Sequence, residues 1–545
     1  MDKEIEKFAL HNAIKYEGKA NPGAVLGQVF AEDPKRKEQT KELAQKVQVI
    51  VKQVNSLSLE EQKARLQKIA PELLEEKKEK KKRELPELPN VHGLVVTRIP
   101  PEPSKYLHLG HAMSFLINYM YAKKYRGKCI LRLDDTNPEK AKKEYYDSLH
   151  EDLLWLRIAP DKTIIASQEM ETFYKYAEIL INKDHAYVCS CDKEKVSEFR
   201  MHAKICEHRV QNKEKNIHIW KEMLAKKYKA GDFTLRLIGE IDSTNAVMRD
   251  PILFRIVKAQ HTLTKDKYVV WPTYDFETVV GEEITGVTHI LRSNEFGEMR
   301  IELQDYIKDL LGFKKQEVLQ YGRINIRGFE TQGRVIREKI EKGEVEGWDD
   351  PRLMTLKALR RRGILPETFY ELVLEVGLSP TATNMDWSVV ASINRKIIDP
   401  TTKRYFFVKN PKKIKIENSV KEAKAPLHPE HKEMGFKTLH FDDEFYIQDD
   451  IEKGKIYRFM HLFNFQNNKF LSEEYDAELK AKIIHCVPVK DAIDIRVLMA
   501  DGSIIKGKAE AALKNLKEGE IIQFERQFFS RLDNKEKMLF IYTHE

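Results

Sequence analysis

The segment His108-Leu109-Gly110-His111 places two imidazoles around a glycine, a pattern suited to binding a nucleotide phosphate. The apolar run at residues 94–99 predicts a buried strand, and prolines at positions 100, 101 and 103 end it in a rigid loop. From His111 to Gly127 the apolar spacing becomes that of a helix. Unpaired N–H groups at a helix N-terminus favour phosphate, and glycine lets a flat group lie against the backbone. We therefore predict an ATP site at this junction, although the short pattern alone also fits a purely structural loop.

A second apolar run, Cys129–Leu133, follows the helix and ends at the acidic residues Asp134 and Asp135. Strand, helix and strand in this order predict two parallel strands joined by a right-handed crossover. Residues 282–295 have the same β-branched composition and predict a further parallel strand that ends near Arg292. Ligands bind at the carboxyl ends of such strands, so distant side chains are expected to converge on one pocket. They are Arg98, Asp134, Tyr274 and Arg292.

These segments resemble class I aminoacyl-tRNA synthetases of the glutamyl and glutaminyl branch. The resemblance lies in TRIPPEPSKYLHLGH at residues 97–111 and LRLDDTNPEK at residues 131–140. HLGH matches the family's HIGH motif, whereas Lys105 stands where the family usually has glycine. GWDDPR at residues 347–352 resembles the archaeal and eukaryotic type of glutamyl-tRNA synthetase. The resemblance covers nearly the whole chain after residue 92 and implies an α/β fold with a Rossmann-type catalytic domain.

The resemblance implies that the substrate is glutamate. An acidic amino acid requires guanidinium groups for its carboxylates and a carboxylate for its ammonium. Arg98 and Arg292 match the carboxylate partners and Asp134 the ammonium partner, while Tyr274 and Thr278 would complete the pocket wall. Glutaminyl members have a neutral residue in place of Arg292, which favours a charged substrate. Either arginine alone could equally form an ordinary surface ion pair.

Residues 327–337 take the place of the family's KMSKS loop, whose lysines hold pyrophosphate as it leaves. Glu330 and Gly333 stand at the two lysine positions. Arg334 or Arg337 could supply the missing charge, and Gly333 would leave backbone N–H groups open to phosphate. A plain loop without phosphate contact is the alternative. The resemblance thus implies catalysis by His108, His111 and Arg334, and binding of ATP with Mg2+ by Pro101, His108, Leu109, Gly110, His111, Gly333 and Arg334.

Two short cysteine and histidine pairs predict a metal site. Cys189 and Cys191 are followed by Cys206 and His208, which gives four ligands that suit a tetrahedral structural zinc. All four positions would be filled, so no open catalytic position remains. Some glutamyl-tRNA synthetases carry zinc at similar spacing in the insertion that binds the acceptor stem. The alternative is a set of buried cysteines beside an exposed histidine.

Composition excludes several classes of protein. The 545 residues carry a net charge of +8 and are 41% hydrophobic, which fits a soluble chain with a polyanionic partner, although a merely lysine-rich protein would look similar. Five cysteines do not make a disulfide framework and indicate a reducing compartment. The first twenty residues lack the apolar core of a signal peptide, and no apolar run would span a bilayer. We expect a cytoplasmic protein, a monomer, with no membrane partner.

Changes in sequence character divide the chain into six expected regions. An N-terminal helical extension with a charged linker, Glu75–Glu84, is expected at 1–92. Catalytic halves at 93–186 and 271–326 enclose an acceptor-stem-binding insertion at 187–270, where Lys227, Lys229, Arg236 and Arg249 could together meet phosphates. The KMSKS-equivalent loop and a helical stem-contact domain, which includes a basic helix at Leu353–Ile364, follow at 327–394. Alternating short strands at 395–545 indicate a two-β-barrel anticodon-binding domain.

The activity implied is that of a glutamate–tRNA ligase of archaeal or eukaryotic type. Its partners would be ATP, L-glutamate and tRNA(Glu), and the sequence leaves open whether tRNA(Gln) is also charged. A synthetase-like tRNA-binding protein with lost or weakened activation is the alternative that the altered loop suggests. Another nucleotidyltransferase with an HxGH motif would lack GWDDPR and the strand-rich C-terminal region.

Overall fold

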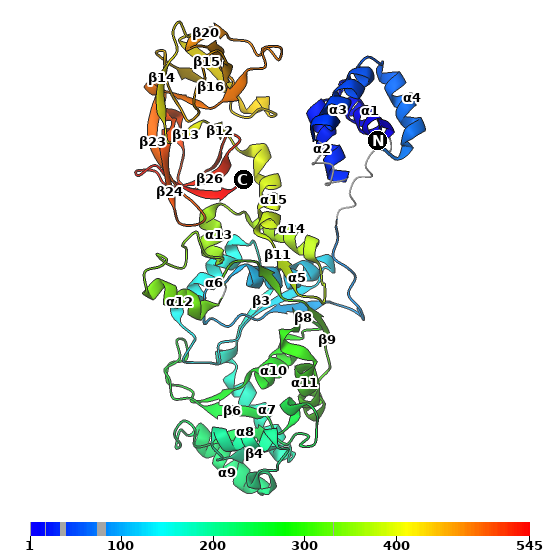
Figure 1. The fold of residues 1–545 in the computed structure, drawn as a ribbon. Helices are drawn as coiled ribbons and strands as arrows, with labels where there is room; N and C mark the ends of the chain where they lie inside the picture. Colours follow the sequence, from blue (N-terminus) through cyan, green and yellow to red (C-terminus); the bar gives the residue numbers. More distant parts are fainter. Residues whose placement is uncertain (1, 17, 33–39, 74–82, 331) are drawn as a thin grey trace. The chain divides into compact units, whose positions relative to one another are not determined.

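The computed structural model describes residues 2–16, 18–32, 40–73, 83–330 and 332–545. It divides into two compact units, Met1–Glu84 and Leu85–Glu545, drawn in blue and in light blue to red in Figure 1. Most of the expected charged linker lies outside the described residues. None of the described helices is long and apolar enough to cross a membrane.

Four α-helices form the first unit over its described residues. They are α1 (Asp2–Lys15), α2 (Pro22–Glu32), α3 (Thr40–Asn55) and α4 (Leu59–Ile69). Apolar side chains spaced for helices, among them Ile5, Ala9, Val47 and Val51, are buried together. Ser58 and Glu61 cap the start of α4 with a reciprocal pair of hydrogen bonds. The predicted helical extension is confirmed, and it has a hydrophobic core of its own.

A parallel sheet of Rossmann type forms the centre of the second unit. Strands β1 (Val96–Ile99), β2 (Lys128–Leu133) and β3 (Lys162–Ile165) are parallel, with α5 (Leu109–Lys124) between the first two and α6 (Lys143–Trp155) before the third. Strands β8 (His289–Ser293) and β9 (Glu317–Tyr321) are parallel to each other. The Thr288 N–H donates to the Val96 carbonyl at 2.9 Å, which brings β8 alongside β1. The predicted parallel arrangement is confirmed.

One sequence expectation in this region is wrong in detail. Residues 282–285, expected in a strand, form the last turn of α10 (Tyr274–Thr285), which ends at Gly286 in the left-handed conformation. Their helical spacing continues from residue 274 and decides against a strand. On α6, Leu149 and Leu153 are buried, whereas Leu154 is 73% exposed. It follows Leu153 directly, about 100° around the helix, and so faces away from the core.

The insertion is an antiparallel sheet with helices. Its strands run in the order β4 (Ala186–Cys189), β5 (Thr234–Leu237), β6 (Ile252–Ile256) and β7 (Val270–Pro272). Helices α8 (Lys193–Met201) and α9 (Lys213–Leu224) belong to the same region, and α7 (Met170–Asn182) and α11 (Gly297–Leu311) pack nearby (Figure 1). Two arginines expected to contact tRNA phosphates instead donate hydrogen bonds to backbone carbonyls of the protein. Arg236 is 1% exposed and donates to the Asp250 carbonyl, and Arg249 donates to the Ser243 and Arg200 carbonyls.

The next region is mostly helical and contacts the C-terminal sheets. It contains α12 (Gly333–Glu341), α13 (Leu356–Arg362), α14 (Pro366–Val376) and α15 (Trp387–Ile398), with β10 (Ile324–Ile326) parallel to β11 (Thr383–Met385). The basic helix predicted at Leu353–Ile364 is α13, which is five residues shorter. Its Arg362 is buried and donates to the Thr543 carbonyl, and Arg361 makes a two-bond ion pair with Asp533. These arginines are therefore not a free cationic face.

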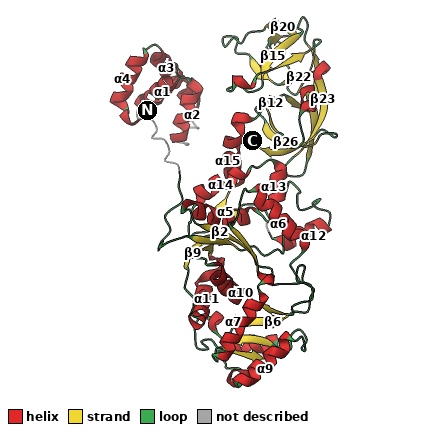
Figure 2. Ribbon diagram, turned by 180° about the vertical axis from the view of Figure 1, so that it is seen from behind, coloured by secondary structure: helices red, strands yellow, loops and turns green. Residues whose placement is uncertain are grey.

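Short strands make up residues 402–545, as the alternating pattern predicts (Figure 2). A seven-stranded sheet has the order β12-β25-β26-β27-β23-β24-β13. A second module contains three sheets, β14-β17-β22, β15-β16 and β20-β19-β18-β21. Across these residues, all of which are described, the sheets are open and not the closed barrels expected. In the seven-stranded sheet the edge strands β12 and β13 are separated by Phe406 and do not pair with each other. The strands of this region have the following bounds: β12 Arg404–Tyr405, β13 Phe407–Lys409, β14 Lys412–Lys415, β15 Glu422–Pro426, β16 Phe436–His440, β17 Glu444–Ile447, β18 Ile456–Phe459, β19 Asn464–Gln466, β20 Lys469–Ser472, β21 Lys482–Ile484, β22 Cys486–Pro488, β23 Ala492–Leu498, β24 Ile504–Glu510, β25 Ile521–Phe524, β26 Phe528–Asn534 and β27 Leu539–His544.

Candidate active site

A cavity of about 360 Å³ opens at the carboxyl ends of β1, β8 and β9, beside the start of α5. Seven of the residues singled out in the sequence line it, and they come from segments almost 200 positions apart. Parallel strands and their following loops bring them to one edge of the sheet, as such folds do for ligands. The seven are Arg98, Pro101, His108, Gly110, His111, Tyr274 and Arg292.

The two histidines form a hydrogen-bonded cap at the start of α5. His108 Nδ1 accepts the Gly110 N–H at 3.1 Å, and His111 Nδ1 accepts the His108 N–H at 3.2 Å. Burial lowers the pKa of His108 to about 3 and that of His111 well below its usual value. Both rings are therefore neutral at pH 7. With Nδ1 accepting, each carries its proton on Nε2 and can donate one hydrogen bond to a ligand oxygen.

The two cavity arginines are buried and held from behind. Arg98 is 2% exposed and its Nε lies 3.4 Å from Glu282 Oε1. Arg292 is 3% exposed and donates to Gln304 Oε1 at 2.9 Å. Burial raises the pKa of Tyr274, and the charges of Arg292 and Arg98 oppose that rise, which shows how near the three groups lie. A guanidinium fixed in this way can bind a carboxylate without first being ordered.

Two residues assigned to the substrate pocket do not line the cavity. Asp134 forms a two-bond ion pair with Arg132, at 2.6 and 2.9 Å. Thr278 is completely buried one turn after Tyr274, and its carbonyl accepts a bond from Arg132. Arg132 thus contacts both residues. Asp134 already pairs with Arg132 and does not line the cavity. Its binding of the substrate ammonium therefore stays a prediction.

The loop residues Gly333 and Arg334 also lie outside the cavity lining. Gly333 begins α12, and Arg334 is 83% exposed on the helix surface, 3.6 Å from Glu338. Leu109 is buried in the core, where its N–H donates to the Met354 carbonyl. The structure therefore separates Arg334 from the histidines that the sequence grouped with it.

Several cavity residues carry no assignment from the sequence. Tyr321 ends β9 and donates to Ser114 Oγ at 2.6 Å, and Arg323 pairs with Glu295 at 2.7 Å. Lys105, noted as a departure from the family pattern, also lines the cavity. The strand-end rule would have found Tyr321 if residues 317–321 had been recognised as a strand. Their mixed composition, EVLQY, gives no clear strand signal.

The four predicted metal ligands come together in the insertion. Cys189, Cys191, Cys206 and His208 place their ligand atoms within 4.8 Å of one another. The Cys206 sulfur lies 3.6 Å from that of Cys189 and 3.5 Å from that of Cys191. Zinc bonds of about 2.3 Å to sulfur in a tetrahedron give sulfur separations of about 3.8 Å, close to these values. His208 Nδ1 faces the sulfurs while its Nε2 contacts Ser190 Oγ at 2.9 Å, which fixes the ring.

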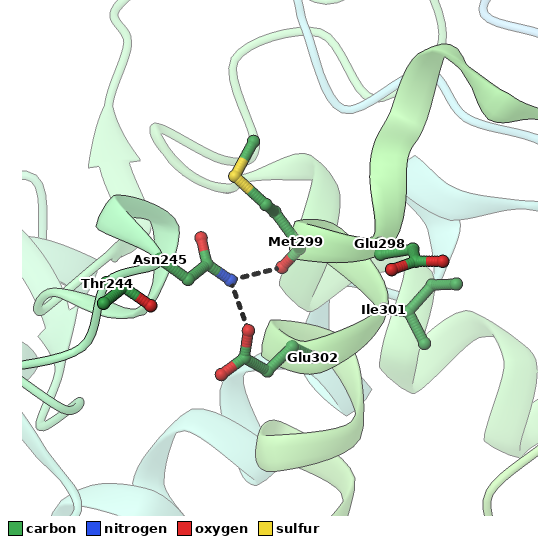
Figure 3. Close-up of a pocket in the computed structure, with 6 residues that line it drawn as sticks. All are labelled: Thr244, Asn245, Glu298, Met299, Ile301 and Glu302. Carbon is green, nitrogen blue, oxygen red and sulfur yellow. Dashed lines mark hydrogen bonds between the residues drawn. The ribbon is translucent and has the colours of Figure 1, made fainter.

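A larger and more open hollow, of about 640 Å³, lies between the short helix η5 (Ala246–Met248) and α11 (Figure 3). Asn245 donates to the Met299 carbonyl at 2.9 Å and to Glu302 at 2.7 Å across it. These bonds tie the insertion to α11. The hollow contains none of the predicted site residues, and Asn245 and Glu302 within it already bind each other, so the smaller cavity at the strand ends is the candidate active site.

Comparison with known proteins agrees with this geometry. Residues 94–400 match the family model for the catalytic domain of tRNA synthetases class I (E and Q). Residues 402–487 and 454–533 match two models for the anticodon-binding domain of the same family. These matches span the sheet, the cavity and the strand-rich C-terminal region.

Curated relatives align over the full chain. A glutamate–tRNA ligase of Pyrococcus furiosus is 41% identical over 571 aligned positions, which cover 100% of both chains. A glutamate–tRNA ligase of Methanocaldococcus jannaschii is 40% identical, again over 100% of both chains. One from Pyrococcus abyssi is 41% identical over 99% of both. The chain belongs to the class I tRNA synthetases of the E and Q type.

Proposed function

We propose that this protein is a glutamate–tRNA ligase, which activates L-glutamate with ATP and transfers it to tRNA(Glu). One observation supports this most strongly. Two buried arginines on different strands, Arg98 and Arg292, line the same cavity as the neutral pair His108 and His111. Fixed guanidinium groups select an acidic substrate, and the neutral imidazoles are donors for phosphate oxygens.

In the first half of the reaction, ATP binds as its magnesium complex against the start of α5. A carboxylate oxygen of glutamate attacks the α-phosphorus, and pyrophosphate leaves with the electrons of the broken bond. The Nε2–H groups of His108 and His111 stabilise charge that develops on the phosphate oxygens. No protein nucleophile is needed, because the arginines hold the amino acid in position for attack.

In the second half, the terminal hydroxyl of the tRNA takes the glutamyl group and AMP leaves. The six regions expected from the sequence divide this task, with the insertion at the acceptor end and the C-terminal sheets at the anticodon. The matched anticodon-binding models support the latter. A cytoplasmic monomer is the simplest form in which the chain would act.

Zinc is proposed as a structural ion in the insertion, held by Cys189, Cys191, Cys206 and His208. The sulfur separations and the orientation of His208 fit tetrahedral coordination. Burial and the neighbouring sulfurs raise the pKa of Cys191 to about 12, and a bound cation would favour the thiolate of this residue.

The test is an aminoacylation assay with both tRNA(Glu) and tRNA(Gln) and with glutamate and glutamine. Glutamate charging of tRNA(Glu) is expected, and charging of tRNA(Gln) shows whether the second tRNA is also a substrate. Binding of tRNA with no glutamate-dependent charging would instead establish a tRNA-binding protein that has lost activation.

A further inference from the structure

Lys105 lies between the candidate active site and the first residue of α12. Lys105 is one of the residues that line the cavity together with His108 and Arg292. A Cβ atom added to Gly333 would lie 3.6 Å from Lys105 Cβ and 3.7 Å from its Cδ. The stem of the lysine therefore lies in contact with the space beside Gly333.

Neighbouring contacts fix the loop that carries Lys105. The ring of Tyr106, the next residue, packs 4.9 Å from the ring of Trp348, which also approaches Gly333. His108 forms an isolated β-bridge with Thr355, and the Leu356 N–H donates to the Leu107 carbonyl at 2.9 Å. The loop, the start of α12 and the turn around Trp348 thus pack as one body, which holds the stem of Lys105 beside the cavity.

The charge of Lys105 acts on the same volume as the two imidazoles. After burial, Lys105 contributes to the lowered pKa of His108, and it also contributes to that of His111. Two other cations near the cavity already have a carboxylate partner, Arg98 in Glu282 and Arg323 in Glu295. Within the described part of the chain, Lys105 forms no ion pair and no hydrogen bond, so its ammonium is available to a ligand.

We propose that Lys105 binds the β- and γ-phosphates of ATP and stabilises pyrophosphate as it leaves. It would supply the cation that Glu330 and Gly333 do not, whereas Arg334 is exposed, pairs with Glu338 and does not line the cavity. This inference rests on the proposed function. In the step concerned, a glutamate carboxylate oxygen bonds to the α-phosphorus, the bond to the oxygen bridging the α- and β-phosphorus breaks, and that oxygen keeps the electron pair. No proton moves, and the ammonium offsets the charge gained by pyrophosphate.

The first test compares Lys105→Met with Lys143→Met in glutamate-dependent ATP–pyrophosphate exchange, with tRNA present. Lys143 is an exposed lysine of α6 paired with Asp147 and provides a matched loss of charge. Lys105→Met is expected to lower kcat about 10²-fold with the KM for glutamate little changed, as for loss of one transition-state donor. Lys105→Arg should retain most of the rate, and Lys143→Met all of it.

Ligand binding separates a phosphate contact from a structural role. In the aminoacylation assay, Lys105→Met should raise the inhibition constant of inorganic pyrophosphate at least tenfold. The affinity of the variant for AMP should be unchanged. Equal losses for both ligands, or full exchange activity in Lys105→Met, would overturn the inference. An inactive parent protein would instead count against the proposed function, so the two failures are distinguishable.

A charge exchange provides the second test. Gly333 is not in the left-handed region, so its backbone accepts a side chain, and removal of the Lys105 side chain vacates the space beside it. The double variant Lys105→Gly with Gly333→Lys should have an exchange rate at least tenfold higher than that of Lys105→Gly alone. A double variant no faster than the single one would contradict the assignment of the cation to this place.

Discussion

Buried guanidinium groups give the cavity its chemical preference. Arg98 and Arg292 are almost inaccessible to water, yet both line a cavity large enough for an amino acid and part of a nucleotide. In a low-dielectric site a charged partner is favoured strongly over a neutral one of the same shape. Selection of glutamate over glutamine would follow from these two residues.

Replacement of Arg292 tests this selectivity. Arg292→Gln should reduce kcat/KM for glutamate about 10²-fold, because a charge-assisted pair is worth roughly 1.5–3 kcal/mol and the variant keeps only a neutral donor. Initial rates of charging over a range of glutamate concentrations measure the change. Arg157→Gln, which removes an exposed pair with Glu367, should leave the rates within about twofold. Equal losses in the two variants would contradict the role of Arg292.

The lowered histidine pKa predicts a pH dependence of stability. The pKa of folded His108 is about 3, whereas an unfolded imidazole titrates near about 6.5. Between these values the unfolded chain binds a proton that the folded chain does not. The free energy of unfolding therefore falls as the pH drops through this window and is independent of His108 above it. Melting temperatures at pH 4.5, 5.5 and 7.5 should fall less steeply with acid in His108→Gln than in the parent, and equal slopes would refute this.

Residue spacing predicts part of the site and misses part of it for physical reasons. The strand-end rule is sufficient to bring Arg98, Tyr274 and Arg292 to one cavity. Asp134 departs from it because Arg132, two positions earlier on the same side of the strand, binds its carboxylate. Arg334 departs because Gly333 starts a helix and turns the next side chain outward. Competition between neighbouring charges is not visible in a spacing pattern.

At the scale of elements, the metal cluster joins a strand to a short helix. Cys189 ends β4, Cys206 directly precedes the short helix η4 (Glu207–Val210) and His208 lies within it, with α8 between the two pairs. The two spaced ligand pairs in the sequence are enough to predict that these four side chains lie together, since such pairs are typical of a tetrahedral zinc site. The buried Arg236 donates to the Cys189 sulfur from β5 and adds a second layer of support.

Metal content tests the cluster directly. The purified protein should contain one zinc per chain, and Cys191→Ser should lose it and lower the melting temperature. Cys486→Ala removes a buried cysteine in the C-terminal region and should retain the metal. Atomic absorption and thermal melting measure both quantities. Zinc retained by Cys191→Ser would show that this sulfur is not a ligand.

Across the whole second unit, α13 is joined to the C-terminal sheet by charge. Arg361 donates to both carboxylate oxygens of Asp533, at 3.0 and 2.8 Å, and both side chains are largely shielded from water. Asn394 of α15 adds a bond to His544 at 2.9 Å. The sequence predicts both regions from their periodicity but cannot show this junction, because its partners lie more than 100 positions apart.

Loss of the Asp533 charge should weaken the junction. Asp533→Asn is expected to lower the free energy of unfolding by about 1–3 kcal/mol, since it removes the two-bond carboxylate partner of Arg361 and leaves only the longer pair with Asp349. Asp494→Asn, in an exposed pair with Lys508 on the same sheet, should cost less than about 0.5 kcal/mol. Urea denaturation followed by tryptophan fluorescence compares them. Similar midpoints for the two variants would show that the junction contributes little.

The internal use of Arg236, Arg249, Arg361 and Arg362 also bears on how the protein holds a nucleic acid. Each cation that meets a backbone phosphate releases counterions and steepens the loss of affinity with rising ionic strength. Arginines already bound to carbonyls or to Asp533 add nothing to that slope. The salt dependence of binding will therefore reflect the lysines and arginines that remain exposed, and the number of basic residues in the chain overstates it.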